Sequence, residues 1–253
     1  MNDTNPHQPI DIKGQSILVV GGGSGIGKAI ARQAATAGAR VQIASRNAQK
    51  LESAAIDIGF ETSWSSIDMT DESAVSSWAA GMGRLDHLVI SASSAAHGPF
   101  AKLETAAVRA MFDAKFFGPY VVARELLPKI NPGGSITFFS GVLSRRPGEN
   151  CSGLGAVNGA VECLSRALAL ELGPGIRVNC CSPGMVRSDA YAALPAEQRE
   201  EMYRSTGASL PLGRVGDTDE IADAVLFMMR NGYLTGQIID IDGGHMIRQY
   251  AQR

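Results

Sequence analysis

Short apolar runs typical of β-strands recur along the 253-residue chain and alternate with helical stretches. Several of these runs are apolar on successive residues, as expected when both faces of a strand are covered. The predicted strands are residues 16–20, 40–44, 87–91, 135–140, 177–182 and 237–241, with a weaker seventh at 61–67. This alternation constrains the fold more than any other feature, because buried parallel strands need helical crossovers between them.

Helical periodicity fills the intervals between the predicted strands. The predicted helices are residues 25–36, 48–58, 71–82, 104–129, 152–172 and 217–230. Strand–helix alternation of this kind predicts a parallel sheet with helices on both faces, joined by right-handed crossovers. We therefore expect one doubly wound α/β domain with a seven-stranded parallel sheet over residues 13–253.

Composition and charge exclude several classes of partner. The chain is 45% hydrophobic and 19% charged, with a formal net charge of -2, as in an ordinary globular protein. This charge gives no electrostatic reason to expect nucleic acid or an anionic membrane as a partner. The chain also contains no run of about 18 apolar residues, the length needed to cross a bilayer. Residues 1–12 are polar and contain two prolines, which favours a mobile N-terminal arm over a signal peptide.

The four cysteines, Cys151, Cys163, Cys180 and Cys181, form no C-x-x-C pair and have no histidine spacing that suits zinc. We expect free thiols in a reducing cytoplasm and no metal site. Cys180 and Cys181 are adjacent in a predicted strand, so their side chains should point to opposite faces of the sheet.

A glycine-rich segment, GGGSGIGKAIA, follows the first predicted strand and opens the first predicted helix. Gly21, Gly25 and Gly27 permit a tight turn and let the backbone approach a pyrophosphate, while the helix N-terminus offers unpaired N–H groups. In this strand–turn–helix context the motif indicates a dinucleotide site and a Rossmann fold. A plain tight turn is the alternative.

The chain resembles the short-chain dehydrogenase/reductase superfamily over about residues 13–246. Four segments carry the resemblance in the same order as in that family: GGGSGIG at 21–27, DMT at 68–70, RVNCCSPGMVRS at 177–188 and LTGQIIDIDGG at 234–244. The resemblance implies a nicotinamide cofactor, with Asp68 near the adenine and a pocket-covering segment at about 187–212. The implied cofactor-binding residues are Gly21, Gly23, Ser24, Gly25, Ile26, Gly27, Ser45, Arg46, Asp68, Met69, Ala92, Lys115, Pro183, Gly184, Val186 and Ser188.

The end of the second predicted strand bears on which dinucleotide binds. A carboxylate there would accept hydrogen bonds from the ribose of NAD and repel a 2′-phosphate. This chain has Ser45 and Arg46 instead, and a guanidinium can bind a phosphate through two parallel hydrogen bonds. We predict NADP(H), with a solvated surface arginine as the alternative.

The family's catalytic residues are absent at the positions that the resemblance assigns to them. The family uses a tyrosine as proton donor, a lysine four residues later, a serine that orients the carbonyl, and an asparagine that anchors a water. Here these positions hold Leu154, Asn158, Gly141 and Lys115, with Ser140 one residue before the serine position. Leucine has no ionisable group, so acid–base catalysis from position 154 is impossible.

Two of these departures are reciprocal, because the family's asparagine is Lys115 and its lysine is Asn158. The two helices face one another in the family, so the positive charge of the family's lysine is here on the opposite helix. In this interpretation Lys115 still reaches the ribose or the substrate. The alternative is coincidence, with the Lys115 side chain extending to solvent.

His97, in the loop after the fourth strand, is a second candidate for acid–base catalysis. The alternative is an exposed loop histidine without a catalytic role. Lys115, His97, Ser140 and Asn158 are the candidate catalytic residues.

These features favour an atypical NADP(H)-dependent oxidoreductase acting on a small molecule. A non-redox enzyme on the same scaffold, or an NADP(H)-binding subunit or sensor without turnover, remains open because fold does not fix reaction. The predicted helices at 104–129 and 152–172 carry many apolar residues, and in the family they pair across a two-fold axis. We therefore expect a homo-oligomer, a homotetramer in particular.

Overall fold

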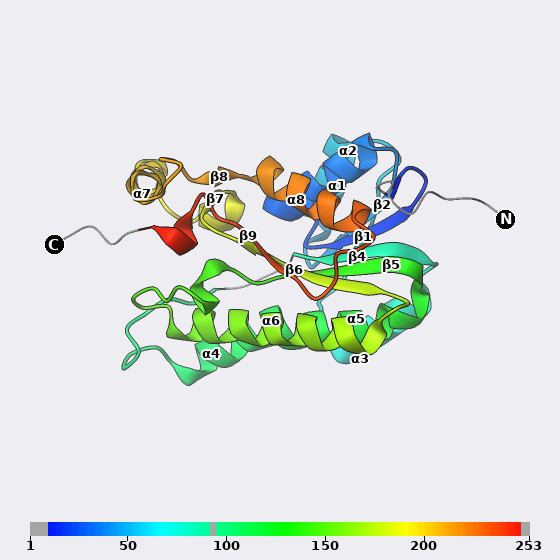
Figure 1. Ribbon diagram of the computed structural model, residues 1–253, viewed down its shortest axis with the longest axis horizontal. Helices are drawn as coiled ribbons and strands as arrows, with labels where there is room; N and C mark the ends of the chain where they lie inside the picture. Colours follow the sequence, from blue (N-terminus) through cyan, green and yellow to red (C-terminus); the bar gives the residue numbers. More distant parts are fainter. Residues whose placement is uncertain (1–9, 92–94, 249–253) are drawn as a thin grey trace.

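The computed structural model describes residues 10–91 and 95–248. A seven-stranded parallel sheet with the strand order β3-β2-β1-β4-β5-β6-β9 forms its centre (Figure 1). The strands are β1 (Ser16–Val20), β2 (Arg40–Ser45), β3 (Ser63–Ser66), β4 (Leu85–Ile90), β5 (Ile130–Phe139), β6 (Arg177–Pro183) and β9 (Ile238–Ile241). The predicted fold class is confirmed, including the weak seventh strand at β3.

The sheet is covered on both faces, which explains why its strands lack polar alternation. The helices α1 (Gly25–Thr36), α2 (Ala48–Ile58) and α8 (Thr218–Arg230) lie on one face, and α3 (Glu72–Ala80), α5 (Gly118–Leu126) and α6 (Ser152–Leu172) on the other (Figure 1). Each face has its own apolar cluster, with Cys181 in the first and Cys180 in the second. The two adjacent cysteines therefore point to opposite sides of the sheet, as predicted.

The single helix expected at 104–129 is interrupted. The chain forms α4 (Thr105–Phe112), a π-helical turn η1 (Asp113–Phe117), α5 and a short 3-10 turn η2 (Leu127–Lys129). Pro119 explains the break, because it has no N–H for the carbonyl of Lys115 four residues earlier and its ring would clash with that carbonyl. The π turn places Lys115 on the inner side, where the residue is buried.

The segment at 187–212, which the resemblance implies covers the pocket, contains regular structure. The strand β7 (Val186–Arg187) pairs with β8 (Gly216–Asp217), and the turn η4 (Asp189–Tyr191) and helix α7 (Ala196–Ala208) lie between them. The ion pair between Arg187 and Glu200, 2.7 Å from Nη1 to Oε1, joins this small sheet to α7. The periodicity of α7 is weak because most of its residues are exposed, which is why the sequence did not predict the helix.

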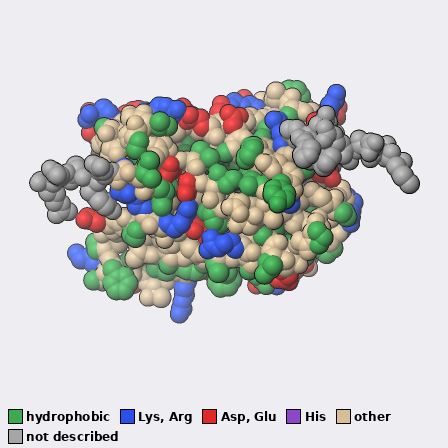
Figure 2. Space-filling view, in the orientation of Figure 1, with side chains coloured by type: hydrophobic (Ala, Val, Ile, Leu, Met, Phe, Trp, Pro, Cys, Tyr) green, Lys and Arg blue, Asp and Glu red, His purple; other side chains and the backbone are tan. Residues whose placement is uncertain are grey.

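The boundaries of the domain differ slightly from expectation. The arm expected at 1–12 is packed from Ile10 on, since the Ile10 N–H donates to the Arg230 carbonyl and Ile12 is buried. No helix within residues 10–91 and 95–248 is long and apolar enough to cross a membrane. On the face seen in Figure 2, acidic and basic side chains are intermixed, in keeping with the small net charge.

Candidate cofactor and active site

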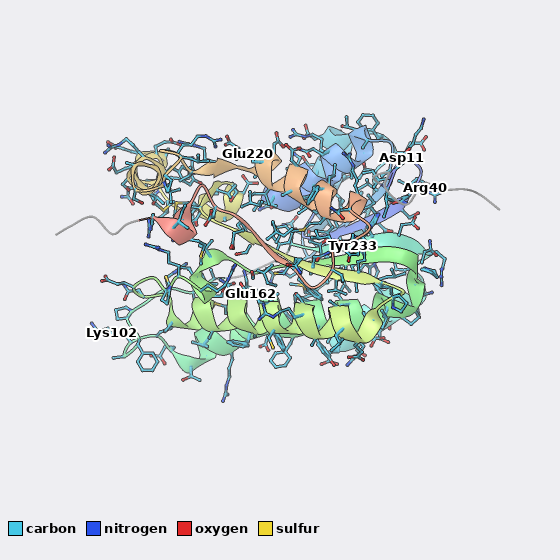
Figure 3. The ribbon with its side chains drawn as sticks, viewed as in Figure 1. Asp11, Arg40, Lys102, Glu162, Glu220 and Tyr233 are labelled. Carbon is cyan, nitrogen blue, oxygen red and sulfur yellow. The ribbon has the colours of Figure 1, made fainter. Side chains whose placement is uncertain are left out.

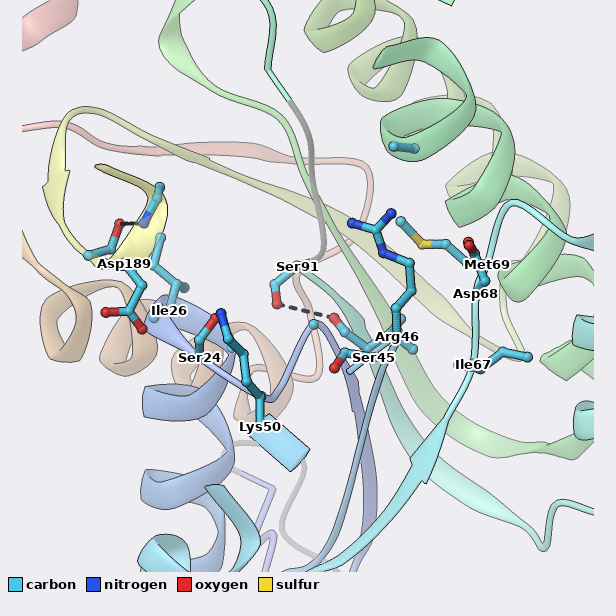
Figure 4. A pocket seen from close by; sticks show the side chains of 18 of the residues that line it. Ser24, Ile26, Ser45, Arg46, Lys50, Ile67, Asp68, Met69, Ser91 and Asp189 are labelled. Carbon is cyan, nitrogen blue, oxygen red and sulfur yellow. Dashed lines mark hydrogen bonds between the residues drawn. The ribbon is translucent and has the colours of Figure 1, made fainter. Parts of the chain in front are cut away.

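A cavity of about 330 Å³ opens at the carboxyl ends of β1 and β2 (Figure 4). Parallel α/β sheets bind ligands at this edge, where the strand order reverses beside β1. The cavity is lined by Val20, Gly21, Gly23, Ser24, Gly25, Ile26, Gly27, Ser45, Arg46, Lys50, Ile67, Asp68, Met69, Thr70, Ser91, Ala114, Ser188, Asp189 and Ala190. The residues come from six separate segments, which the sheet topology brings to one place.

The loop between β1 and α1 requires glycine at specific positions. Gly21 and Gly25 have positive φ angles of 91° and 51°, which L side chains rarely adopt. A Cβ atom on Gly27 would lie 2.2 Å from the Gly21 carbonyl oxygen, so α1 can start against the loop only without a side chain there. The loop therefore presents bare backbone to the cavity.

The N-terminus of α1 is open to an anion. Ser24 is the N-cap residue, but its hydroxyl makes no capping hydrogen bond, and the first turn of α1 contains no acidic side chain. The unpaired N–H groups and the partial positive charge of the helix end are thus left for a ligand. A pyrophosphate fits this end of the cavity.

Two cations flank the cavity where β2 ends (Figure 4). Arg46 and Lys50 are exposed, and no hydrogen bond or ion pair occupies either side-chain cation within the described residues. By contrast, Lys28 on α1 forms an ion pair with Asp57, 2.8 Å from Nζ to Oδ2. Arg46 and Lys50 are therefore available for a phosphate, and no carboxylate at the end of β2 opposes one.

Asp68 lies across the cavity from Lys50, and Arg46 is drawn between them (Figure 4). Its Oδ1 accepts hydrogen bonds from the Thr70 backbone N–H at 3.0 Å and the Thr70 hydroxyl at 2.8 Å. These two bonds lower the pKa of the Asp68 carboxyl and fix its orientation. The carboxylate is thus a fixed acceptor at the end where the resemblance puts the adenine.

Eleven of the sixteen predicted cofactor-binding residues line this cavity. Ala92 lies outside the described residues, and four others, Lys115, Pro183, Gly184 and Val186, do not line it. Val186 is buried in the apolar cluster beneath α8, and a Cβ on Gly184 would lie 2.8 Å from Asp242 Cα. These two residues therefore act on the backbone beside the cavity. The residues of this segment that line the cavity are Ser188, Asp189 and Ala190.

Lys115 and Asn158, the reciprocal pair, bind two consecutive peptides. Lys115 Nζ donates to the Ser140 carbonyl at 3.1 Å, and Asn158 Nδ2 donates to the next carbonyl, that of Gly141, at 3.2 Å. Both residues are buried, so the alternative of a solvent-exposed Lys115 side chain is wrong. Burial lowers the pKa of the Lys115 ammonium from 10.5 to about 8.

This pair is incompletely satisfied by the protein. Asn158 Oδ1 is a buried acceptor without a hydrogen-bond partner among the described residues. An ammonium carries three donors, and one of those of Lys115 binds the Ser140 carbonyl. Ala114, next to Lys115 in the chain, lines the cavity, whereas Lys115 and Asn158 themselves do not. Asn158 Oδ1 thus lacks a donor, and a hydroxyl group, which both donates and accepts, would complement the two groups.

Gly141 and Asn158 are adapted to one another. A Cβ at position 141 would lie 3.1 Å from Asn158 Nδ2, closer than ordinary side-chain contacts. A serine at this position would therefore crowd the side-chain amide of Asn158, for which Gly141 leaves room.

Leu154, at the position that the resemblance assigns to the tyrosine, is buried with Met111 and Val157. Ala96 packs against this cluster and holds the His97 loop beside it. His97 is exposed, and its Nδ1 lies 3.5 Å from Cys151 Sγ, one turn before Leu154 on the chain. Ser140 is buried, and its hydroxyl donates to Glu162 Oε1 at 3.1 Å, so it is engaged with the protein.

A family model described as enoyl-(acyl carrier protein) reductase matches residues 20–246. A short-chain dehydrogenase/reductase of Stachybotrys chlorohalonatus is 32% identical over 94% of this chain and 99% of that protein. The chain belongs to the short-chain dehydrogenase/reductase family. A human 3-oxoacyl-[acyl-carrier-protein] reductase is 30% identical over 89% of this chain and 95% of its own.

Solved structures agree with this membership. A small-chain dehydrogenase in complex with NADPH matches with a TM-score of 0.81 and 34% identity, over 92% of this chain and 99% of that one. A short-chain dehydrogenase/reductase family protein matches with a TM-score of 0.84 and 32% identity, over 94% and 99%. The Rossmann-type sheet and its helices are thus those of this family.

Two residues of this short-chain dehydrogenase/reductase were missed from the sequence. Lys50 follows Arg46 by four residues, a spacing that brings two cations to one side of a starting helix. Glu162 follows Leu154 and Asn158 at the same spacing on α6, so a carboxylate on a buried helix face was the available signal. No group of three or more His, Cys, Asp or Glu side chains that could hold a metal occurs in the described part of the chain.

Proposed function

We propose that this short-chain dehydrogenase/reductase is an NADP(H)-dependent oxidoreductase that acts on a small molecule without the family's tyrosine. The observation that carries the proposal is the cavity between the glycine loop and the two exposed cations, Arg46 and Lys50. The NADPH complex of a relative with 34% identity supports the same dinucleotide. The orphaned Asn158 Oδ1 beside Lys115 supports a ribose at the other end.

Each part of the site has a distinct task in this proposal. The glycine loop and the first turn of α1 bind the pyrophosphate, and Arg46 and Lys50 bind the 2′-phosphate. Asp68 accepts a hydrogen bond from the adenine, and Lys115 and Asn158 orient the nicotinamide ribose. NADP(H) supplies or accepts a hydride when bound, and the protein positions the substrate against it.

The substrate class follows from what the site lacks. Reduction of a plain ketone produces an alkoxide that must be protonated as it forms. General acid catalysis contributes about 10²–10⁴-fold and oriented oxyanion donors about 10²–10³-fold to such reactions. Leu154 and Gly141 supply neither group. A conjugated enone, whose anion is stabilised internally, or a cationic imine avoids this penalty.

The test is NADPH consumption by the purified protein with a panel of plain ketones, plain aldehydes, conjugated enones and cationic imines. We expect consumption with an enone or an imine, and none above background with the plain carbonyls. Binding of NADPH without consumption across the panel would contradict the redox proposal and favour a non-redox enzyme on the same scaffold, or a cofactor-binding subunit or sensor. Absence of NADPH binding would contradict it altogether.

Brisk reduction of plain ketones would mean that another residue has replaced the tyrosine. His97 is the first candidate, because its loop packs beside Leu154. In that case His97→Ala should abolish the activity, whereas the same variant should leave enone or imine reduction within about twofold of wild type. Ketone reduction that survives in His97→Ala would exclude this histidine as the acid.

A further inference from the structure

Glu162 is a buried carboxylate in the middle of α6, and Figure 3 shows it on the side of the helix that faces the sheet. The residue is 3% exposed. Its Oε1 accepts hydrogen bonds from the hydroxyls of Ser140, at 3.1 Å, and Ser144. Its Oε2 lies 3.4 Å from Nε of Arg145. Burying a carboxylate costs several kcal/mol without such partners, so Glu162, together with Asn158, binds the segment 140–145 to α6.

The same segment is fixed from its other side. The Arg145 guanidinium donates through Nη1 to Asp240 Oδ2 of β9 at 2.8 Å and through Nη2 to the Ser182 hydroxyl of β6 at 3.1 Å. The carboxylates of Glu162 and Asp240 therefore share one guanidinium. This chain of charges joins α6, the end of β5 and the last two strands of the sheet, and fixed hydrogen-bonded charges hold a backbone more rigidly than apolar contacts.

What this segment presents to the site is its two consecutive carbonyls. The Ser140 carbonyl receives Lys115 Nζ, and the Gly141 carbonyl receives Asn158 Nδ2. Asn158 is also one turn before Glu162 on the same helix. The positions of the ammonium and of the orphaned Asn158 Oδ1 thus depend on two consecutive carbonyls of the segment 140–145, to which Glu162 is hydrogen-bonded.

We propose that Glu162 is a positioning residue that sets the Lys115–Asn158 pair for the cofactor. It acts through the peptide of Ser140 and Gly141 and touches neither cofactor nor substrate. This inference rests on the proposed function, because it assumes that Lys115 and Asn158 hold the ribose of NADPH. It goes further by assigning the geometry of that pair to a buried carboxylate on the same helix as Asn158.

Glu162→Gln removes the charge and keeps the volume. The glutamine amide cannot accept from the Arg145 guanidinium and from both hydroxyls at once, so the segment 140–145 should shift. Since hydrogen bonds to a charged group are at stake, we expect NADPH binding to weaken about tenfold, in a variant that still unfolds cooperatively. Glu171→Gln, an exposed change on the same helix, is the matched control and should bind as wild type does.

A double-mutant cycle distinguishes positioning from a merely structural role. NADPH affinity is measured by titration calorimetry for wild type, Glu162→Gln, Lys115→Met and the double variant. If Glu162 acts through Lys115, the double variant should bind within about twofold of Lys115→Met alone. Multiplicative losses in the double variant, or an unchanged affinity in Glu162→Gln, overturn the inference while the proposed function stands.

The remaining outcomes are also decisive. A wild-type protein that does not bind NADPH removes the proposed function and this inference together. Should Glu162→Gln fail to fold, Ser144→Ala replaces it in the same cycle, because this change deletes one donor to Glu162 and leaves every charge in place. If Ser144→Ala lowers NADPH affinity about threefold in wild type but not in the Lys115→Met background, the inference is supported. If the two changes lower NADPH affinity independently, it is overturned.

Discussion

Two side-chain cations at the end of β2 should select the phosphorylated cofactor. Arg46→Asp should cost about 1.5–3 kcal/mol of NADPH binding, the range for a hydrogen bond to a charged group, and Lys50→Ala about 1 kcal/mol for its single ammonium. Titration calorimetry with NADPH and NADH measures both effects. Lys28→Ala, whose ammonium pairs with Asp57, is the control and should leave NADPH affinity unchanged. Equal wild-type affinity for the two cofactors would refute the assignment.

Lys115 should make stability rise with pH. Burial lowers its pKa from 10.5 to about 8, so below pH 8 the folded state carries the full cost of a buried ammonium. Between about pH 8 and 10.5 the folded state releases this proton before the unfolded state does, which raises the free energy of unfolding by about 3 kcal/mol. Urea unfolding of wild type and Lys115→Met across this window measures the difference. The same dependence of the free energy of unfolding on pH in the two proteins would contradict the prediction.

At the scale of single elements, the centre of the sheet contains an acid-sensitive histidine. His87 on β4 is 1% exposed, with Nδ1 2.8 Å from the Ser135 hydroxyl and Nε2 2.7 Å from Gln15 Oε1. Burial, with a smaller effect of the Arg177 charge, lowers its pKa from 6.5 to about 4. Its contribution to stability is complete above pH 6.5 and is lost as the pH falls toward 4.

As the pH falls from 6.5 to about 4, we expect His87 to lower the free energy of unfolding by about 3 kcal/mol, because the unfolded chain takes up the proton first. Urea unfolding at pH 7 and pH 4.5 measures it. His87→Gln keeps both polar partners but cannot be protonated, so this variant should lose correspondingly less stability on acidification. The same acid-induced loss in both proteins would place the sensitivity elsewhere.

At the scale of the whole molecule, the face formed by α5 and α6 should join copies of this chain. Phe116, Leu164 and Leu168, among the apolar residues that suggested an interface, are partly buried against the protein's own core. Phe117 and Leu170 remain 52% and 86% exposed. We expect a homotetramer by light scattering at micromolar concentration, and Leu170→Asp should lower the mass observed. A wild-type monomer would refute the expectation.

The sequence by itself predicted the architecture, because apolar runs without alternation need cover on both faces and a doubly wound sheet supplies it. It also predicted the glycine loop and Arg46, since both are local signals within one strand–turn–helix unit. The π turn at Asp113–Phe117 escaped prediction, although Gly118-Pro119 was its signal, because the apolar period continues across the break.

Only the tertiary structure decided the state of the residues that replace the catalytic set. Whether Lys115 reaches solvent or the Ser140 carbonyl depends on how three segments, far apart in sequence, approach one another. The same holds for Glu162, whose partners on 140–145 and, through Arg145, on β9 are invisible to helical periodicity. Local pattern determines which elements form, whereas burial and hydrogen bonding of a polar side chain are properties of the packed fold.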